Sequence, residues 1–146
     1  MTNHGQENID RVKSFYRAIQ GRDFTAAGNL LDANVEWIEP KAEGLWFTGT
    51  HRGASAVLQE VIEPSFDKIA DFRVEADHYF DVGDYVLVMA HFYGRAKATG
   101  KELKVPSAHV YTLRNGKIVR FYAYHDIATL QEALGVTQAE ARRMAA

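Results

Sequence analysis

The sequence predicts a single α+β domain in which helices precede an antiparallel sheet. Apolar residues recur with the helical period of about 3.6 up to residue 70, and with the strand period of two from residue 71 onward. Three pairs of turn-forming residues, Gly83-Asp84, Thr99-Gly100 and Asn115-Gly116, then divide the second half into adjacent strands. A group of helices followed by a group of hairpin-connected strands is typical of an α+β fold.

The composition is that of one globular domain. The 146 residues are 47% apolar and 25% charged, so a single core is expected over residues 1–146. The net charge of −2 argues against a nucleic-acid partner, and no apolar run approaches the roughly 20 residues that a membrane span requires. The absence of cysteine excludes thiolate metal sites and cysteine nucleophiles. Because there is no apolar leader, the chain is expected to be cytoplasmic, with no nucleic-acid and no membrane partner.

Residues 8–40 predict two helices and a strand. An apolar stripe follows a candidate cap at Asn8 and ends near Gly21: Ile9, Val12, Phe15, Tyr16 and Ile19. Asp23 can cap a short second helix. Residues 34–40 then alternate in polarity, which places three side chains on one face of a strand: Val35, Trp37 and Glu39.

The middle of the chain predicts a loop over residues 44–52, which could cover a pocket and on which His51 is expected at the surface. A third helix should start near Gly53, and Pro64 should kink or end it. The four strands are expected at about 71–82, 84–98, 102–114 and 117–126. A short helix follows them, and a capping-box pattern then predicts a peripheral helical tail over residues 136–146.

The Asn115-Gly116 turn fixes a pairing register for the last two strands. A two-residue turn pairs Arg114 with Lys117, which places Val110 opposite Phe121. Because side chains alternate between faces, one face is mainly apolar and suits a pocket wall: Pro106, Ala108, Val110, Thr112, Val119, Phe121, Ala123 and His125. The other face is aromatic and suits contact with a partner: Ser107, His109, Tyr111, Leu113, Ile118, Arg120, Tyr122 and Tyr124. A patch of that size predicts a homodimer.

Three strings and the order of the elements resemble the NTF2-like superfamily, particularly its SnoaL-like and ketosteroid-isomerase-like branch. The strings are FYRAIQGRDFTAAGNLLDANVEW, GTHRGASAVLQEV and SAHVYTLRNGKIVRFYAYHDIATLQEALG, which lie within residues 8–135. The resemblance implies a strongly curved antiparallel sheet that helices close into a cone, with an apolar pocket inside and a dimer contact outside. One fold supports many reactions, so the chemistry has to be inferred from the pocket.

The resemblance also implies roles for single residues. Glu39-Pro40 matches the base and the following proline of the ketosteroid isomerases, so Glu39 is a candidate base. The two oxyanion donors of those enzymes fall on Phe15 and Ala108, which cannot donate a hydrogen bond, and their mechanism is therefore not expected. Asp126 occupies the acid/base position of the SnoaL-like polyketide cyclases. Strict alternation would put Asp126 on the outer face unless a bulge turns it inward.

Two histidines are further candidates for acid/base chemistry. His125 ends the apolar face of the last strand, and an ordinary histidine pKa of about 6.5 permits proton exchange near neutrality. His91 shares a strand face with Met89 and Tyr93, and the resemblance puts that face inward. A pair of pocket histidines is similar to that of the scytalone dehydratases. Either histidine could instead be structural, and Glu39 could be a solvated charge at a strand end.

Together these arguments predict a small enzyme that acts on a hydrophobic, oxygenated molecule by cofactor-free acid/base chemistry. The candidate catalytic residues are Glu39, His91, His125 and Asp126. The candidate pocket residues are Phe15, Trp37, Met89, Tyr93, Ala108, Val110 and Phe121. No cofactor or metal is expected, because the histidines lack the spacing of a zinc site. Isomerisation, cyclisation and dehydration remain open, as does a non-catalytic ligand-binding or dimerisation module.

Overall fold

The computed structural model describes residues 4–136, so the expected C-terminal tail lies outside the described residues except for Val136. The helices are α1 (His4–Gln20), α2 (Phe24–Leu30), α3 (Ala54–Val57), α4 (Glu63–Lys68) and α5 (Ile127–Leu134), with a π-helical turn, η1 (Leu58–Ile62), between α3 and α4. The strands are β1 (Leu31–Glu39), β2 (Gly49–Arg52), β3 (Ile69–Val82), β4 (Tyr85–Ala96), β5 (Glu102–Arg114) and β6 (Lys117–His125). The predicted α+β fold class is confirmed.

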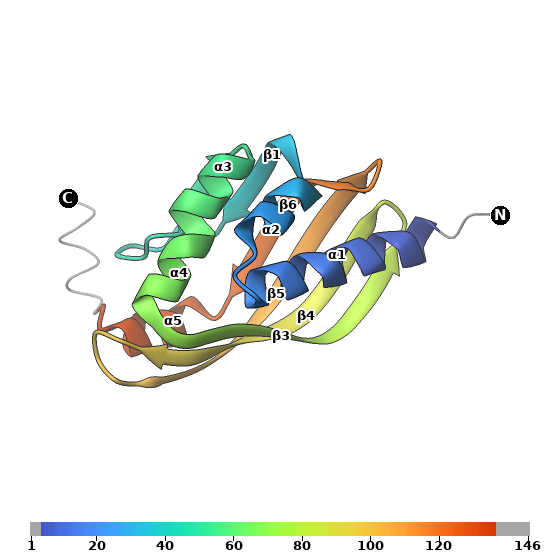
Figure 1. The fold of residues 1–146 in the computed structure, drawn as a ribbon. Helices are drawn as coiled ribbons and strands as arrows, with labels where there is room; N and C mark the ends of the chain where they lie inside the picture. Colours follow the sequence, from blue (N-terminus) through green and yellow to red (C-terminus); the bar gives the residue numbers. More distant parts are fainter. Residues whose placement is uncertain (1–3, 137–146) are drawn as a thin grey trace.

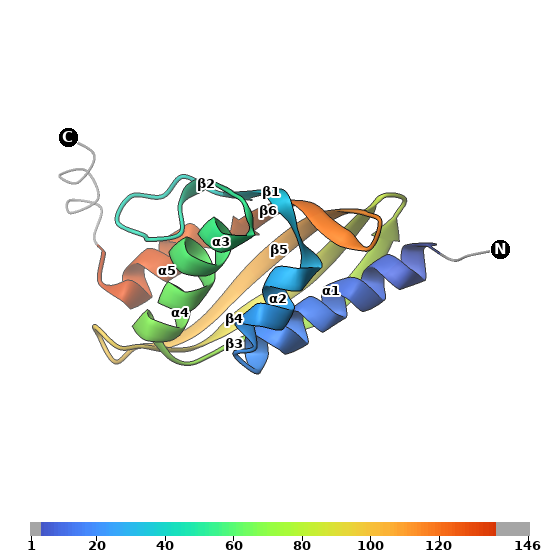
Figure 2. The ribbon, with the colours of Figure 1, turned by 45° about the horizontal axis from the view of Figure 1, so that its top comes forward.

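The strands form one curved sheet in the order β2-β1-β6-β5-β4-β3. Neighbouring strands are antiparallel except for β1 and β6, which run parallel. Helices α1, α2 and the α3–α4 segment cover one face of the sheet (Figure 1), and the sheet curves beneath them in the view of Figure 2. The buried core fills the space between these helices and that inner face.

Local sequence signals account for the N-terminal elements. α1 buries the predicted apolar stripe, except that Ile9 is only partly buried, and the Asp23 carboxylate caps α2 by accepting a hydrogen bond from the Ala26 amide at 3.0 Å. β1 buries its alternate residues, as predicted. Pro64 does not end the third helix, which continues to Lys68. The proline lies in the first turn of α4, where a missing N–H is tolerated, and the π-helical turn precedes it.

The expectation of a loop over residues 44–52 is wrong for its second half. Residues 49–52 form β2, which pairs with β1 so that His51 lies opposite Trp37. His51 is buried rather than at the surface. Its Nδ1 lies 2.7 Å from a carboxylate oxygen of Glu60, and its Nε2 lies 2.8 Å from the carbonyl oxygen of Phe47. These two bonds anchor the preceding loop against the α3–α4 segment.

The predicted register of the β5–β6 hairpin is correct at the turn and wrong farther along the two strands. Arg114 pairs with Lys117, but Val119 is an extra residue on β6, and the pairing then shifts by one. Tyr111 therefore lies opposite Phe121, where Val110 was expected. A bulge of this kind lets β6 bury Ile118 and Phe121 together, although strict alternation would put them on opposite faces.

The bulge reverses which face of β5 points inward. The inner face carries Ser107, His109, Tyr111 and Leu113, all buried. Ala108 and Val110, predicted to line the pocket, lie on the outer face instead. The predicted aromatic partner face is therefore wrong for β5.

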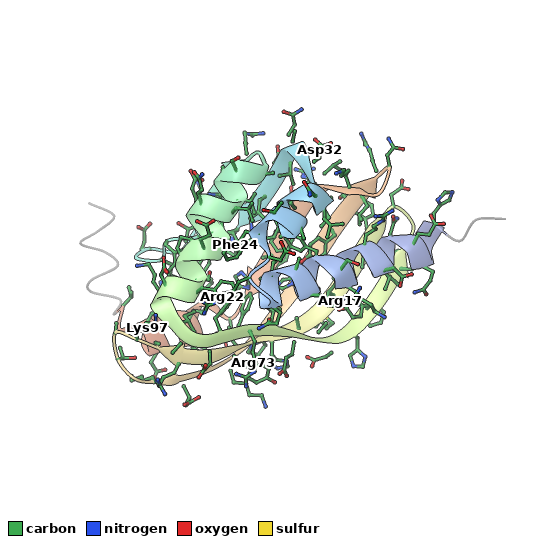
Figure 3. The ribbon with its side chains drawn as sticks, in the orientation of Figure 1. Arg17, Arg22, Phe24, Asp32, Arg73 and Lys97 are labelled. Atoms are coloured by element: carbon green, nitrogen blue, oxygen red, sulfur yellow. The ribbon has the colours of Figure 1, made fainter. Side chains whose placement is uncertain are left out.

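The predicted inner face of β4 is wrong as well. This strand has apolar residues on both faces, so alternation alone could not choose between them. Val86, Val88 and Ala90 are buried, and Met89 is 43% exposed on the opposite face. Tyr93 lies on that outer face too, with the guanidinium of Arg73 4.9 Å from its ring centre. Figure 3 shows Arg73 on the side of β3 away from the helices.

Gly94 is required where the pairing between β3 and β4 is irregular, between Ala70 and Arg73. It has a φ of 148°, which side chains rarely adopt, and an added Cβ would lie 2.8 Å from the carbonyl oxygen of Ala70 and also clash with the Ile69 side chain. Gly94→Ala should therefore lower the free energy of unfolding by about 3 kcal/mol. Gly100→Ala is the matched control, because Gly100 also has a positive φ but open space around it. Urea unfolding should give a loss of only about 1 kcal/mol for the control, and equal losses would contradict the steric argument.

Candidate functional site

An internal cavity lies between the inner face of the sheet and the covering helices. Its volume is about 80 Å³, and a water needs roughly 10–15 Å³ on this scale, so there is space for several waters or a small ligand. Most of the lining side chains are aromatic or aliphatic: Phe15, Ile19, Trp37, Trp46, Phe47, Val61, Ile62, Phe72, Phe92, Leu103, Phe121 and Leu130. Six polar side chains line the same cavity: Tyr16, Glu39, Ser65, His109, Tyr111 and His125.

Glu39 enters the cavity from the end of β1. Alternation along β1 puts its side chain on the same face as Trp37, whose indole N–H donates to Glu39 Oε1 at 2.9 Å. The indole is held in turn by stacking on Phe121, with ring centres 3.6 Å apart. The residue is only 6% exposed. The Glu39 carboxylate is therefore buried in an apolar wall of the cavity, and it accepts a hydrogen bond from one rigidly held, neutral donor.

His125 provides the second contact to this carboxylate. Its Nε2 lies 2.7 Å from Glu39 Oε2, and both side chains are almost fully buried, at 2% and 5% exposure respectively. The rings of Phe92 and Phe47 pack against the imidazole, with centre-to-centre distances of 4.9 and 5.5 Å. Its Nδ1 lies 2.6 Å from the hydroxyl oxygen of Ser107. Both ring nitrogens are thus engaged.

Ser107 connects this pair to a second histidine. The Ser107 hydroxyl oxygen lies 2.8 Å from His109 Nε2, and His109 Nδ1 lies 2.7 Å from the Tyr16 hydroxyl. Burial lowers the pKa of His109 from 6.5 to about 3, and the nearby His125 lowers it further in the same direction. Burial also raises the pKa of Tyr16 well above its ordinary value. His109 is therefore neutral, and Tyr16 keeps its proton near neutral pH.

The structure brings together part of the predicted site. Glu39 and His125 share the cavity and are in direct contact, and Phe15, Trp37 and Phe121 line it. Four predicted pocket residues lie outside the cavity: Met89, Tyr93, Ala108 and Val110. They were expected on the inner faces of β4 and β5, but they lie on the outer faces.

Two predicted catalytic residues are not part of the cavity. His91 lies on the outer face of β4, where its Nδ1 is 2.6 Å from a carboxylate oxygen of Asp77. Asp126 caps α5 instead of turning inward. It accepts hydrogen bonds from the amide and the hydroxyl of Thr129 at 3.3 and 2.7 Å. Both placements correct the sequence-based assignment.

Three inner polar residues were not predicted as site residues from the sequence: Tyr16, Ser107 and His109. Ser107 and His109 were assigned to the outer face, because the bulge at Val119 was not anticipated. The one available signal was the spacing of Ile118 and Phe121, which alternation cannot bury together. Tyr16 was recognised as part of an apolar stripe, but its hydroxyl group was not considered.

Within the described residues, no cluster of three or more histidine, aspartate or glutamate side chains could hold a metal ion. None of the helices in that part of the chain is long and apolar enough to cross a membrane.

The family model of the SnoaL-like domain matches residues 12–121. The chain belongs to the SnoaL-like family. No curated protein matches the sequence. Similar solved structures include an NTF2-like protein of unknown function from Burkholderia pseudomallei, 24% identical, with a TM-score of 0.80 over 88% of this chain and 97% of that one.

Two further solved structures share the fold of this SnoaL-like domain. One is a proposed SnoaL-like polyketide cyclase from Jannaschia, 14% identical, with a TM-score of 0.80 over 94% of this chain and 97% of that one. The other is a proposed isomerase from Bacillus subtilis, 21% identical, with a TM-score of 0.78 over 93% and 98% of the two chains. At these identities the likeness establishes the fold, and the predicted NTF2-like class is confirmed.

Proposed function

We propose that this SnoaL-like domain removes a proton from the carbon next to a carbonyl group in a small, hydrophobic, oxygenated molecule, without a cofactor. The observation that carries the proposal is the Glu39 carboxylate, which is buried in an apolar cavity and has the His125 imidazole in direct contact. In the described part of the chain, no lysine or arginine pairs with it. A carboxylate in such surroundings is a suitable general base.

The cavity also contains a group that can assist at the carbonyl oxygen. As the proton leaves carbon, negative charge develops on that oxygen, and a positioned hydroxyl donor stabilises it. Tyr16 is the candidate donor, since its hydroxyl keeps its proton at neutral pH. Isomerisation, aldol-type cyclisation and dehydration all start with this step. The names of the cyclase-like and isomerase-like neighbours are compatible with it but select none of the three.

Deuterium exchange tests this proposal without knowledge of the natural substrate. The protein would be incubated in D2O with a panel of apolar ketones, and C–H signals next to the carbonyl would be followed by NMR. We expect exchange that depends on the protein, saturates with ketone concentration and is strongest for ketones that fit an apolar cavity. A panel in which no ketone exchanges faster than in buffer would contradict the proposal.

A non-catalytic binding module is the second candidate. It is favoured by one observation, that in the described residues every buried side-chain nitrogen or oxygen already has a hydrogen-bond partner. Such a network can orient a ligand without reacting with it. Ketones that raise the unfolding temperature of the protein but do not exchange would support this alternative.

We also propose that the protein is a homodimer formed through the outer face of the sheet. Apolar side chains gather there: Leu87, Met89, Val110, Tyr122 and Tyr124, of which Tyr124 is 63% exposed. Sedimentation should give twice the chain mass of 16.4 kDa. Met89→Glu should raise the dimer dissociation constant by about 10²-fold, because an unpaired buried charge costs about 3 kcal/mol. Thr25→Glu, at an exposed position of α2 on the other side of the sheet, is the control, and a wild-type monomer would refute the proposal.

A further inference from the structure

The polar side chains of the cavity form one continuous chain of hydrogen bonds. It runs from the Tyr16 hydroxyl to His109 at 2.7 Å, on to Ser107 at 2.8 Å, then to His125 at 2.6 Å and to Glu39 at 2.7 Å. Its two ends, Tyr16 and Glu39, both line the cavity, as do the two histidines. Ser107, 5% exposed, bridges the two imidazoles. Nothing in the function proposed above uses Ser107 or His109.

The three hydrogen bonds between Tyr16 and His125 must all point in the same direction. A neutral imidazole donates at one nitrogen and accepts at the other, and burial keeps His109 neutral. Ser107 has a single hydroxyl proton, so it donates to one imidazole and accepts from the other. Two arrangements satisfy both conditions, one pointing toward Glu39 and one pointing toward Tyr16.

The two arrangements present different groups to the cavity. When the chain points toward Glu39, the Tyr16 hydroxyl donates to His109 and only its lone pairs face a ligand. When it points toward Tyr16, His109 donates to the phenol oxygen, and the Tyr16 proton can be donated to the neighbouring Tyr111 hydroxyl or to a ligand oxygen. In that case His125 donates at both nitrogens and is a cation paired with the Glu39 carboxylate. In the absence of a ligand, the arrangements differ by one proton on the Glu39–His125 pair.

We propose that Ser107 and His109 relay protons between the Glu39–His125 pair and Tyr16, which makes Tyr16 the second acid/base group of the cavity. This inference rests on the proposed function and specifies its substrate as an enolisable ketone. The ketone oxygen would bind Tyr16, and its acidic C–H bond would face Glu39. Ser107 and His109 act through their neighbours and are positioning residues.

Every proton that moves in the relay is accounted for in the forward and in the reverse direction. Glu39 takes the proton from carbon, the C–H electron pair becomes the C=C bond, and the carbonyl π pair takes the proton of Tyr16. Tyr16 is then reprotonated from His109 Nδ1, and His109 receives the Ser107 proton at Nε2. Ser107 in turn takes the Nδ1 proton of His125.

The products are a neutral enol, protonated Glu39 and neutral His125, so no proton enters or leaves the site. Reversal of the relay, with Glu39 returning its proton to a different carbon of a conjugated enol, shifts the double bond and restores the starting arrangement.

A nucleophilic role for Ser107 fits this geometry less well. Its contacts to a histidine that also binds a glutamate are those of a catalytic triad. However, Ser107 is not among the residues that line the cavity, and its hydroxyl is held between two imidazoles. A relay needs only these two contacts, and no approach of substrate to the serine.

Nitrogen NMR of the full-length protein labelled with ¹⁵N-histidine tests the relay without any substrate. The pH would be varied over the range in which the protein stays folded, and the two ring nitrogens of His109 would be followed. We expect His109 to remain neutral while its proton moves from Nε2 to Nδ1 as the pair gains a proton. In Ser107→Ala this tautomer change should be lost, since the link between the two imidazoles is gone.

Ser65→Ala is the matched control, because Ser65 is equally buried but bonds only to the carbonyl oxygen of Val61. It should keep the tautomer change. If Ser107→Ala does not fold, Tyr16→Phe serves instead, and His109 should then stay protonated at Nε2 throughout. A wild-type His109 that keeps one tautomer, or a change that persists in Ser107→Ala, would overturn the relay. Failure of the deuterium exchange alone would refute the proposed enzyme and leave this result standing.

Discussion

Glu39→Gln should lower the rate of deuterium exchange into a ketone substrate by about 10²–10⁴-fold, the usual contribution of a general base. Glutamine has nearly the same shape, and its amide oxygen can still accept the hydrogen bond from Trp37. Its amide N–H can donate to an unprotonated nitrogen of His125. The fold is therefore expected to survive, while the proton acceptor is lost. The rate would be measured by NMR in D2O, and thermal unfolding would verify that the variant is folded.

Glu36→Gln is the matched control on the same strand. Glu36 lies on the outer face of β1, where its carboxylate pairs with Arg52 at 2.7 Å and Arg120 at 3.1 Å. Loss of this exposed pairing should cost less than about 1 kcal/mol of stability and leave the exchange rate unchanged. A Glu39→Gln protein that exchanges as fast as the wild type would show that another group accepts the proton.

The part of the site on β1 and β6 could be predicted because side chains alternate regularly between the two faces along this part of both strands. Alternation puts Trp37 and Glu39 on one face, and it puts Phe121 and His125 together on the adjacent strand. Since β1 and β6 pair side by side, with Trp37 opposite Phe121, the contact between Glu39 and His125 follows from faces that the sequence specifies. The predicted helices and tight turns rest on equally local signals.

The part on β4 and β5 could not be predicted from alternation. A single extra residue, Val119, changes the relation between β5 and β6, and it brings His109 into the core in place of Ala108. The cause is not local, because it depends on burying Ile118 and Phe121 in the same core. On β4 both faces are apolar, so only pairing with β5 decides that Val88 points inward and Met89 outward. Errors of register therefore propagate from one strand to the next.

His109 should make the protein sensitive to acid. Its pKa is about 3 in the folded protein against 6.5 for an ordinary histidine, so between these pH values the unfolded chain binds a proton that the folded protein does not. The contribution of this pKa difference to stability is fully present above pH 6.5, and it is lost as the pH is lowered toward 3. One pKa unit corresponds to about 1.4 kcal/mol, so the loss from this residue between pH 6.5 and 4.5 is about 2–3 kcal/mol.

His109→Gln should flatten this dependence, because glutamine has no proton to gain. Its amide can still contact the hydroxyls of Ser107 and Tyr16, which limits the loss of stability at neutral pH to about 1–3 kcal/mol. Urea unfolding at several pH values between 4.5 and 7 would give the slope of the unfolding free energy for each protein. Carboxylates titrate in the same range, but they are common to both proteins, so the difference in slope isolates His109. The exposed His78 provides the control, and His78→Gln should keep the wild-type slope. Equal slopes for wild type and His109→Gln would mean that His109 takes up its proton in the folded state, which would also remove the neutral link on which the relay depends.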